Sequence, residues 1–131
     1  MEAVSKPAFT EIHDHMSSDE IFLEKATKAI EDNMDREDFD VSLLAEMLSV
    51  ENKQLYRKLK QLTGCSPVNY IRTLRMRKAS ILLKEDRFTV AEVMYLVGYS
   101  NSSYFSKCFS NEFGMTPKEF VIKNRHKKEQ I

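Results

Sequence analysis

Basic side chains recur at helical spacing between residues 53 and 62. At about 100° per residue, Lys53, Arg57 and Lys60 lie on one side of an expected helix, opposite its leucines. Tyr56 lies on the flank of this stripe. Arginine can donate two hydrogen bonds to O6 and N7 of one guanine, and lysine can neutralise a phosphate. On one helix alone, such a stripe is usually an ordinary solvated surface.

The same pattern occurs again 50 residues later. Aligning Gly64 with Gly114 matches these pairs: Leu55 with Phe105, Arg57 with Lys107, Leu59 with Phe109, Pro67 with Pro117, Tyr70 with Phe120 and Ile71 with Val121. The outward stripe of the second copy is Ser103, Lys107 and Ser110. Before the turn the offset is 49, so the second turn holds one extra residue. Two copies are too few for a solenoid, so one helical unit is used twice.

Local signals predict an all-α protein of about seven helices. The chain has only 3 Gly and 3 Pro, and its apolar positions follow helical spacing. Helix starts are expected at five polar caps: Ser17, Asp40, Ser66, Thr89 and Thr116. Two short helices across a turn, used twice, predict two helix-turn-helix units. A helix from Pro67 to about Glu85, roughly 28 Å long, would join them and could hold two outward helices near successive major grooves, which recur every ~34 Å.

One charged residue on this joining helix has a different expected role. Arg75 projects among apolar residues, so its guanidinium needs a partner. We expect a packed stem and a paired guanidinium rather than a base contact. The two cysteines do not form a disulfide framework. Cys108 lies on an apolar face and is expected to be a buried thiol, whereas Cys65 follows Gly64 in a turn and is expected to be a partly exposed free thiol.

A family resemblance covers roughly residues 22–123. The motif GYSNSSYFSKCFSNEFGMTPKEF resembles that of AraC/XylS-type transcription regulators, and the earlier repeat resembles their first helix-turn-helix. The segments QLYRKLKQLTGCSP, YIRTLRMRKAS and YFSKCF are most similar to the C-terminal output domain of hybrid two-component sensor-regulators. The chain departs from the family at Ser49, where glycine is usual, and at Met94, where alanine is frequent. Ser49 predicts strain in the first turn.

The resemblance implies sequence-specific binding to double-stranded DNA as the output domain of a larger regulator. The residues that match the family's base-contacting positions are Lys53, Tyr56, Arg57, Ser102, Ser103, Ser106 and Lys107. The residues expected to contact the DNA backbone are Lys60, Asn101, Ser110 and Lys118. Further implied partners are RNA polymerase and the upstream receiver or sensor domains of the parent chain. The fragment itself is expected to be monomeric or weakly self-associating.

The charge distribution agrees with a nucleic-acid partner. The net charge is zero, but residues 1–40 carry 4 Lys/Arg and 12 Asp/Glu, whereas residues 41–131 carry 16 Lys/Arg and 8 Asp/Glu. The balance is therefore −8 in the first part and +8 in the second. A polyanion is attracted by a local cluster of positive charge, whatever the net charge of the whole chain. The basic part coincides with the repeat.

Other classes of function are less well supported. The chain has no phosphate-binding glycine loop, no paired histidine ligands on a helix and no clear Ser/His/Asp set, so no enzyme activity and no cofactor are expected of this fragment. His13 and His15 lack third and fourth metal ligands nearby. RNA binding is disfavoured because exposed aromatic residues are few. The main alternative is a helical protein–protein interaction module without DNA affinity.

The sequence divides into three parts. Residues 1–16 are interpreted as a linker remnant or a disordered segment, 17–124 as the double helix-turn-helix domain, and 125–131 as a basic tail. No apolar run approaches the ~18 residues of a membrane span, and no signal peptide is recognised. A cytoplasmic location is expected for the domain. The resemblance implies that a parent protein could carry kinase activity upstream and be anchored in the inner membrane.

Overall fold

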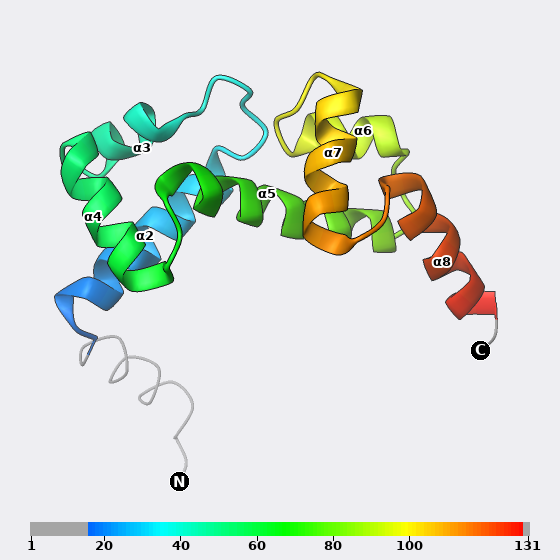
Figure 1. Ribbon diagram of the computed structural model, residues 1–131, viewed down its shortest axis with the longest axis horizontal. Helices are drawn as coiled ribbons and strands as arrows, with labels where there is room; N and C mark the ends of the chain where they lie inside the picture. Colours follow the sequence, from blue (N-terminus) through cyan, green and yellow to red (C-terminus); the bar gives the residue numbers. More distant parts are fainter. Residues whose placement is uncertain (1–15, 130–131) are drawn as a thin grey trace, which may run out of the picture.

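The computed structural model describes residues 16–129, and these residues form seven helices. In chain order they are α2 (Ser18–Asp32), α3 (Val41–Met47), α4 (Asn52–Thr63), α5 (Pro67–Lys84), α6 (Val90–Leu96), α7 (Ser102–Phe113) and α8 (Pro117–Glu129). The unbroken α5 runs through the middle of the molecule, with α3 and α4 towards one end and α6 and α7 towards the other (Figure 1). The predicted all-α architecture, two helix-turn-helix units joined by a long helix, is confirmed.

The helices begin at the predicted caps. Backbone N–H groups donate to the side chains of Ser17, Asp40, Ser66, Thr89 and Thr116. At Ser17, Thr89 and Thr116, a glutamate three residues later accepts a hydrogen bond from the N–H of the cap residue, which completes a capping box. These local bonds satisfy N–H groups that a helix leaves without an internal partner, so they set where each helix starts.

The C-terminal helix extends further than the sequence interpretation assumed. Residues 125–129, assigned to a basic tail, continue α8 as far as Glu129. The segment contains no glycine or proline to stop the helix, and its lysine, arginine and glutamate residues favour helix. Arg125 also lies 3.5 Å from the carboxylate of Asp86, which ties this part of α8 to the turn after α5. Residues 1–15, assigned to a linker, lie outside the described residues.

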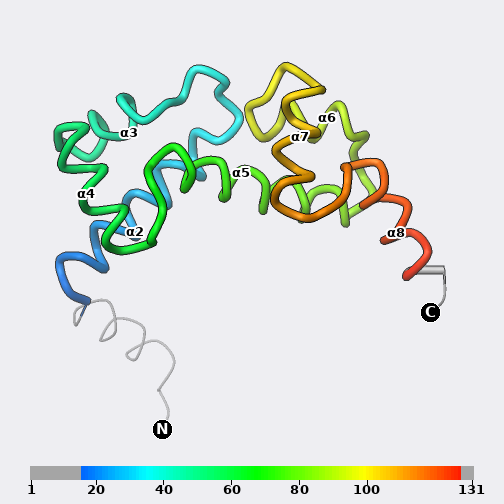
Figure 2. The backbone as a smooth tube through the Cα atoms, in the orientation of Figure 1, coloured from blue at the N-terminus to red at the C-terminus, as the bar shows by residue number. Residues whose placement is uncertain are grey.

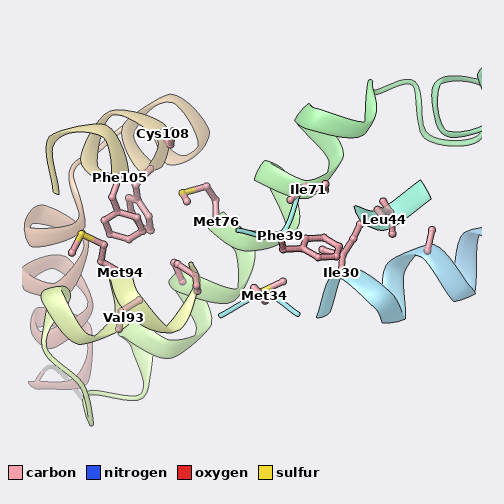
Figure 3. Close-up of a cluster of buried hydrophobic side chains, with 14 of the residues drawn as sticks. Ile30, Met34, Phe39, Leu44, Ile71, Met76, Val93, Met94, Phe105 and Cys108 are labelled. Atoms are coloured by element: carbon pink, nitrogen blue, oxygen red, sulfur yellow. The ribbon is translucent and has the colours of Figure 1, made fainter. Parts of the chain in front are cut away.

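The buried side chains form a single core along α5. Ile71 and Met76 of α5 lie between buried residues of both units, as Figure 3 shows. Leu44 belongs to the first unit, and Val93 and Phe105 belong to the second. The predicted inward positions Leu55, Leu59, Phe105, Cys108 and Phe109 are all buried. Cys65 is half-buried and both thiols are free, as expected.

The turns of the two units differ as predicted. Four residues separate α3 from α4, whereas five separate α6 from α7. Gly98 is the second residue of the second turn and has φ +88°, and Ser49 occupies the matching position of the first turn with φ +58°. A left-handed conformation costs an ordinary L-residue about 1–2 kcal/mol, because its Cβ crowds the following carbonyl. The strain expected at Ser49 is therefore present in the backbone.

Replacing Ser49 with glycine should stabilise the domain. Relief of the left-handed strain is worth about 1–2 kcal/mol, and the greater freedom of glycine in the unfolded chain offsets about 0.4–1 kcal/mol of it. The net gain in the free energy of unfolding should be about 0.5–1 kcal/mol, measurable by urea denaturation. The matched control is Ser103→Gly, an exposed serine within α7, which should instead destabilise. A loss of stability in Ser49→Gly would show that the serine side chain compensates the strain.

Arg75 has the structural role expected of it. The residue is only 8% exposed, and its Nη2 donates a hydrogen bond of 2.8 Å to the backbone carbonyl of Arg36. Its guanidinium carbon lies 5.6 Å from the centre of the Tyr99 ring. The charge is therefore paired with a carbonyl dipole and an aromatic face, while the stem packs in the core.

Candidate nucleic-acid interface

The outward face of α4 carries exposed cations. Lys53, Arg57 and Lys60 are all exposed, on the side opposite the buried Leu55 and Leu59. Among the described residues, no carboxylate forms an ion pair with any of these three cations. The stripe predicted from the sequence is thus a row of exposed cations, and their charges are available to an anionic partner.

A fourth lysine of α4 has a structural contact instead. Lys58 Nζ lies 3.5 Å from Asp19 Oδ1 and 5.0 Å from the centre of the Phe22 ring, both on α2. Its side chain therefore helps to hold α4 against α2. The cations of α4 therefore have two roles: Lys58 packs against α2, whereas Lys53, Arg57 and Lys60 face outward.

The N-terminal part of α4 lines a surface hollow of about 520 Å³, which is formed by Glu51, Lys53, Gln54, Tyr56 and Arg57. Tyr56 is 52% exposed. Cationic, amide and phenol donors therefore gather within one helical turn, the combination that can reach base edges and phosphates in a groove. Glu51 contributes the one carboxylate of this hollow.

The outward face of α7 is shorter and carries more hydroxyls. Ser102, Ser103 and Lys107 are exposed, whereas Ser106 and Ser110 are half-buried. A serine side chain extends less far than an arginine or lysine, so this helix must approach a ligand more closely to contact it. The same face therefore has one cation where α4 has three.

The two remaining predicted backbone contacts lie near the ends of helices. Asn101 is the N-cap of α7, and its Oδ1 accepts a hydrogen bond of 2.8 Å from the N–H of Tyr104. Its Oδ1 is thus used within the protein, which leaves the amide NH2 for an external acceptor. Lys118 is exposed in the first turn of α8. The structure places Lys118 on a different helix from the other second-unit residues, beyond the turn at Gly114.

Two aromatic or amide residues of this surface were not assigned a role from the sequence. Gln54 lines the hollow beside Lys53, and Tyr104 is 48% exposed in the first turn of α7. The signal that links them is the repeat, because the offset of 50 aligns Gln54 with Tyr104. The amide of Gln54 and the ring of Tyr104 thus lie at equivalent positions of the two outward helices.

Tyr99 lies beneath this second surface as a neutral group. Its ring centre is 5.9 Å from that of Tyr104 and 5.7 Å from that of Phe105. Burial is the main cause that raises the pKa of Tyr99 to about 12. Since the phenol stays protonated at neutral pH, Tyr99 adds no negative charge to the face beside α7.

Residues 16–129 show no sign of a metal site or a membrane span. No group of three or more His, Cys, Asp or Glu side chains in this range could hold a metal ion. The histidines considered from the sequence, His13 and His15, lie outside the range. None of the described helices is both long and apolar enough to cross a membrane.

Comparison with known proteins agrees with this geometry. A family model described as a helix-turn-helix domain, of the AraC type, matches residues 44–122. The chain is 38% identical over 104 residues to histidine kinase P4 from Formosa agariphila. The aligned residues are 79% of this chain and 8% of the kinase. It is 37% identical over 93 residues to the HTH-type transcriptional activator RhaS from Mannheimia succiniciproducens, covering 71% of this chain and 34% of that protein. The chain thus spans well under half the length of these relatives.

The fold is also similar to that of solved structures. The C-terminal domain of AraT, a response regulator from Geobacillus stearothermophilus, superposes with a TM-score of 0.74 at 28% identity, covering 83% of this chain and 88% of that domain. The family match includes both outward helices, α4 and α7, and the whole of α5 between them. This chain therefore belongs to the AraC-type family of double helix-turn-helix DNA-binding domains.

Proposed function

We propose that this domain recognises a bipartite site in double-stranded DNA, with α4 in one major groove and α7 in the next. The observation that carries the proposal is the repeated outward helix. Each unit presents one helix whose apolar face is buried and whose basic or hydroxyl face is exposed. α5 has 18 residues, or roughly 27 Å at ~1.5 Å per residue, which is close to the ~34 Å between successive major grooves on one side of DNA.

In this proposal the two helices contribute differently. Lys53, Tyr56 and Arg57 of α4 contact base edges, and Lys60 contacts a phosphate. On α7, Ser102, Ser103, Ser106 and Lys107 contact bases at shorter range, which favours reading of groove shape as well as of hydrogen-bonding groups. Asn101, Ser110 and Lys118 position the second unit on the backbone. The complete assignment therefore makes the first unit the stronger base reader.

The domain acts within a larger regulator of transcription. Its relatives include a protein named as a histidine kinase and one named as a transcriptional activator, and the chain covers only a small part of each. We infer that receiver or sensor domains lie upstream in the parent protein, that kinase activity and any membrane anchor belong to those parts, and that the domain works in the cytoplasm. RNA polymerase is the partner through which bound DNA would be transcribed.

Substituting Arg57 and Lys60 separately should distinguish base reading from phosphate anchoring. Arg57 lies near the middle of α4, whereas Lys60 lies in its last turn. A bidentate contact to guanine is worth about 1–3 kcal/mol of discrimination, so Arg57→Ala should weaken binding and relax the preference at one base pair. Lys60→Ala should weaken all sequences alike and reduce the slope of log K against log salt by roughly 1.

The measurement is a competition titration on a duplex chosen by selection from randomised DNA, together with its single-base variants. Lys58→Ala is the control on the same helix, because Lys58 is held by Asp19 and Phe22. It should leave the ranking of the duplexes unchanged. If Arg57→Ala ranks the duplexes as the wild type does, α4 does not read the bases. If the wild type binds no duplex, a protein-binding module is favoured.

A further inference from the structure

The two helix-turn-helix units contact each other directly, in addition to their connection through α5. Residues 33–40, the segment between α2 and α3, lie against the turn between α6 and α7. Figure 2 shows these two loops side by side above α5. Two contacts join them directly, at Gly98 and Ser100, and Arg75 of α5 contacts both loops. We call these contacts and the residues 34–37 that receive them the junction.

The closest of these contacts requires glycine. A Cβ added at Gly98 would lie 2.5 Å from the backbone oxygen of Met34 and 2.9 Å from Nη2 of Arg75. The two other glycines with positive φ, Gly64 and Gly114, have nothing within 4 Å of such an atom. All three have a left-handed backbone, so only Gly98 combines that conformation with a close approach between units.

Arg75 links both sides of the junction. From its position on α5, it donates a hydrogen bond to the carbonyl of Arg36 in the first unit and lies over the ring of Tyr99 in the second. The side chain is 8% exposed. Because its guanidinium is planar and largely buried, both contacts are held in one geometry.

Further contacts fix the segment in place. Ser100 Oγ donates a hydrogen bond to the Glu37 carboxylate across the junction. Met34 and Phe39, at either end of the same region, are buried in the common core, as Figure 3 shows. The segment is therefore anchored on both sides of the residues that meet the second turn.

We infer that the junction fixes the orientation of α4 relative to α7 and so determines which spacing between two DNA half-sites the domain accepts. This inference rests on the proposed function. Inserting one base pair between half-sites turns the second by about 34° and moves it by about 3.4 Å along the axis. Each unit also packs on α5, and the junction adds direct contacts between the two units. With the junction intact, rotation of either unit must break the contacts at Gly98, Arg75 and Ser100.

The test compares a junction variant with the wild type on DNA of different spacing. Arg75→Met with Ser100→Ala removes both side-chain contacts while keeping an apolar stem in the core. Wild-type affinity should fall about tenfold or more when one base pair is inserted between or removed from the selected half-sites, as for a mismatched site. In the double variant the penalty should shrink to about threefold or less, with weaker binding at the selected spacing and unchanged base preference within each half-site.

A glycine pair provides a matched control. Gly98→Ala should also flatten the spacing profile, whereas Gly114→Ala imposes the same backbone strain in open space and should keep it sharp. If Gly98→Ala does not fold, the double variant still decides the matter. An identical spacing penalty in the wild type and the double variant would overturn the inference.

A measurement without DNA separates the inference from the proposed function. Residual dipolar couplings of backbone amides in the two units should fit one alignment tensor in the wild type and require two in the double variant. A single tensor in both proteins would contradict the inference even if DNA binding is confirmed. A wild type that binds no duplex would contradict the proposed function, whereas one that binds with no spacing preference would contradict only the role of the junction.

Discussion

Replacing Phe109 with alanine should lower the free energy of unfolding by about 3–5 kcal/mol, as large aromatic truncations in cores do. Phe109 is 0% exposed. Its ring centre lies 4.6 Å from that of Phe113, 5.3 Å from that of Phe120 and 6.2 Å from that of Phe105. The substitution would leave a cavity between α7 and α8 that these rings cannot fill by small shifts, since they already contact one another.

The measurement is chemical denaturation of the two proteins in urea, with Tyr95→Ala as the control. Tyr95 is a large aromatic residue of α6 that is 60% exposed, so its loss should change stability by less than about 0.5 kcal/mol. Because Phe120 belongs to α8, hydrogen exchange in α8 should also rise in Phe109→Ala. Equal stability of the wild type and Phe109→Ala would mean that the outward and inward faces of α7 have been exchanged.

The local part of the fold could be predicted because its causes lie close together in the sequence. The capping bonds at Ser17, Thr89 and Thr116 each join residues three apart, and the glycine ends of α4 and α7 need only one residue with positive φ. The buried faces followed from periodicity alone. Repetition then added what no single helix could provide, since it identified two outward stripes of the same kind.

The contacts between the units could not be predicted in the same way. Ser100 and Glu37 are 63 positions apart, and Arg75 and the Arg36 carbonyl are 39 apart. Nothing in the composition of residues 33–40, half of which are acidic, indicates that they dock on a second turn. The sequence predicted that Arg75 needs a partner but not which one. Every residue has a backbone carbonyl, so no residue type identifies the acceptor.

The candidate interface shows the same division. The helical positions of Lys53, Arg57 and Lys60 placed them outward, and the structure exposes all three. The role of Lys58 depended on Asp19 and Phe22 of α2, which pattern reasoning could not bring together. The capping bond of Asn101 was accessible from sequence, since asparagine before a helix commonly caps it. This bond shows that a residue predicted to contact DNA can also have a structural role as a helix cap.

Binding to duplex DNA should depend steeply on salt, with a slope of log K against log salt near −5. Contacts with about six phosphates give this value, because each neutralised phosphate of B-DNA contributes about −0.9. A rise from 50 to 200 mM salt should then weaken binding roughly 10³-fold. We expect the charges responsible to be those on the exposed faces of α4, α7 and the first turn of α8, where Lys107 and Lys118 would supplement the cations of α4.

Two variants locate this effect on the molecule. Lys118→Ala should make the slope shallower by roughly 1, since one phosphate contact is lost. Lys25→Ala, which removes another exposed lysine, on α2 in the acidic first part of the chain, should leave the slope unchanged. The slopes are obtained from fluorescence anisotropy titrations of one duplex at several salt concentrations. If affinity does not depend on salt, the exposed cations do not contact phosphates. The surface of α4 and α7 would then favour a module that binds protein.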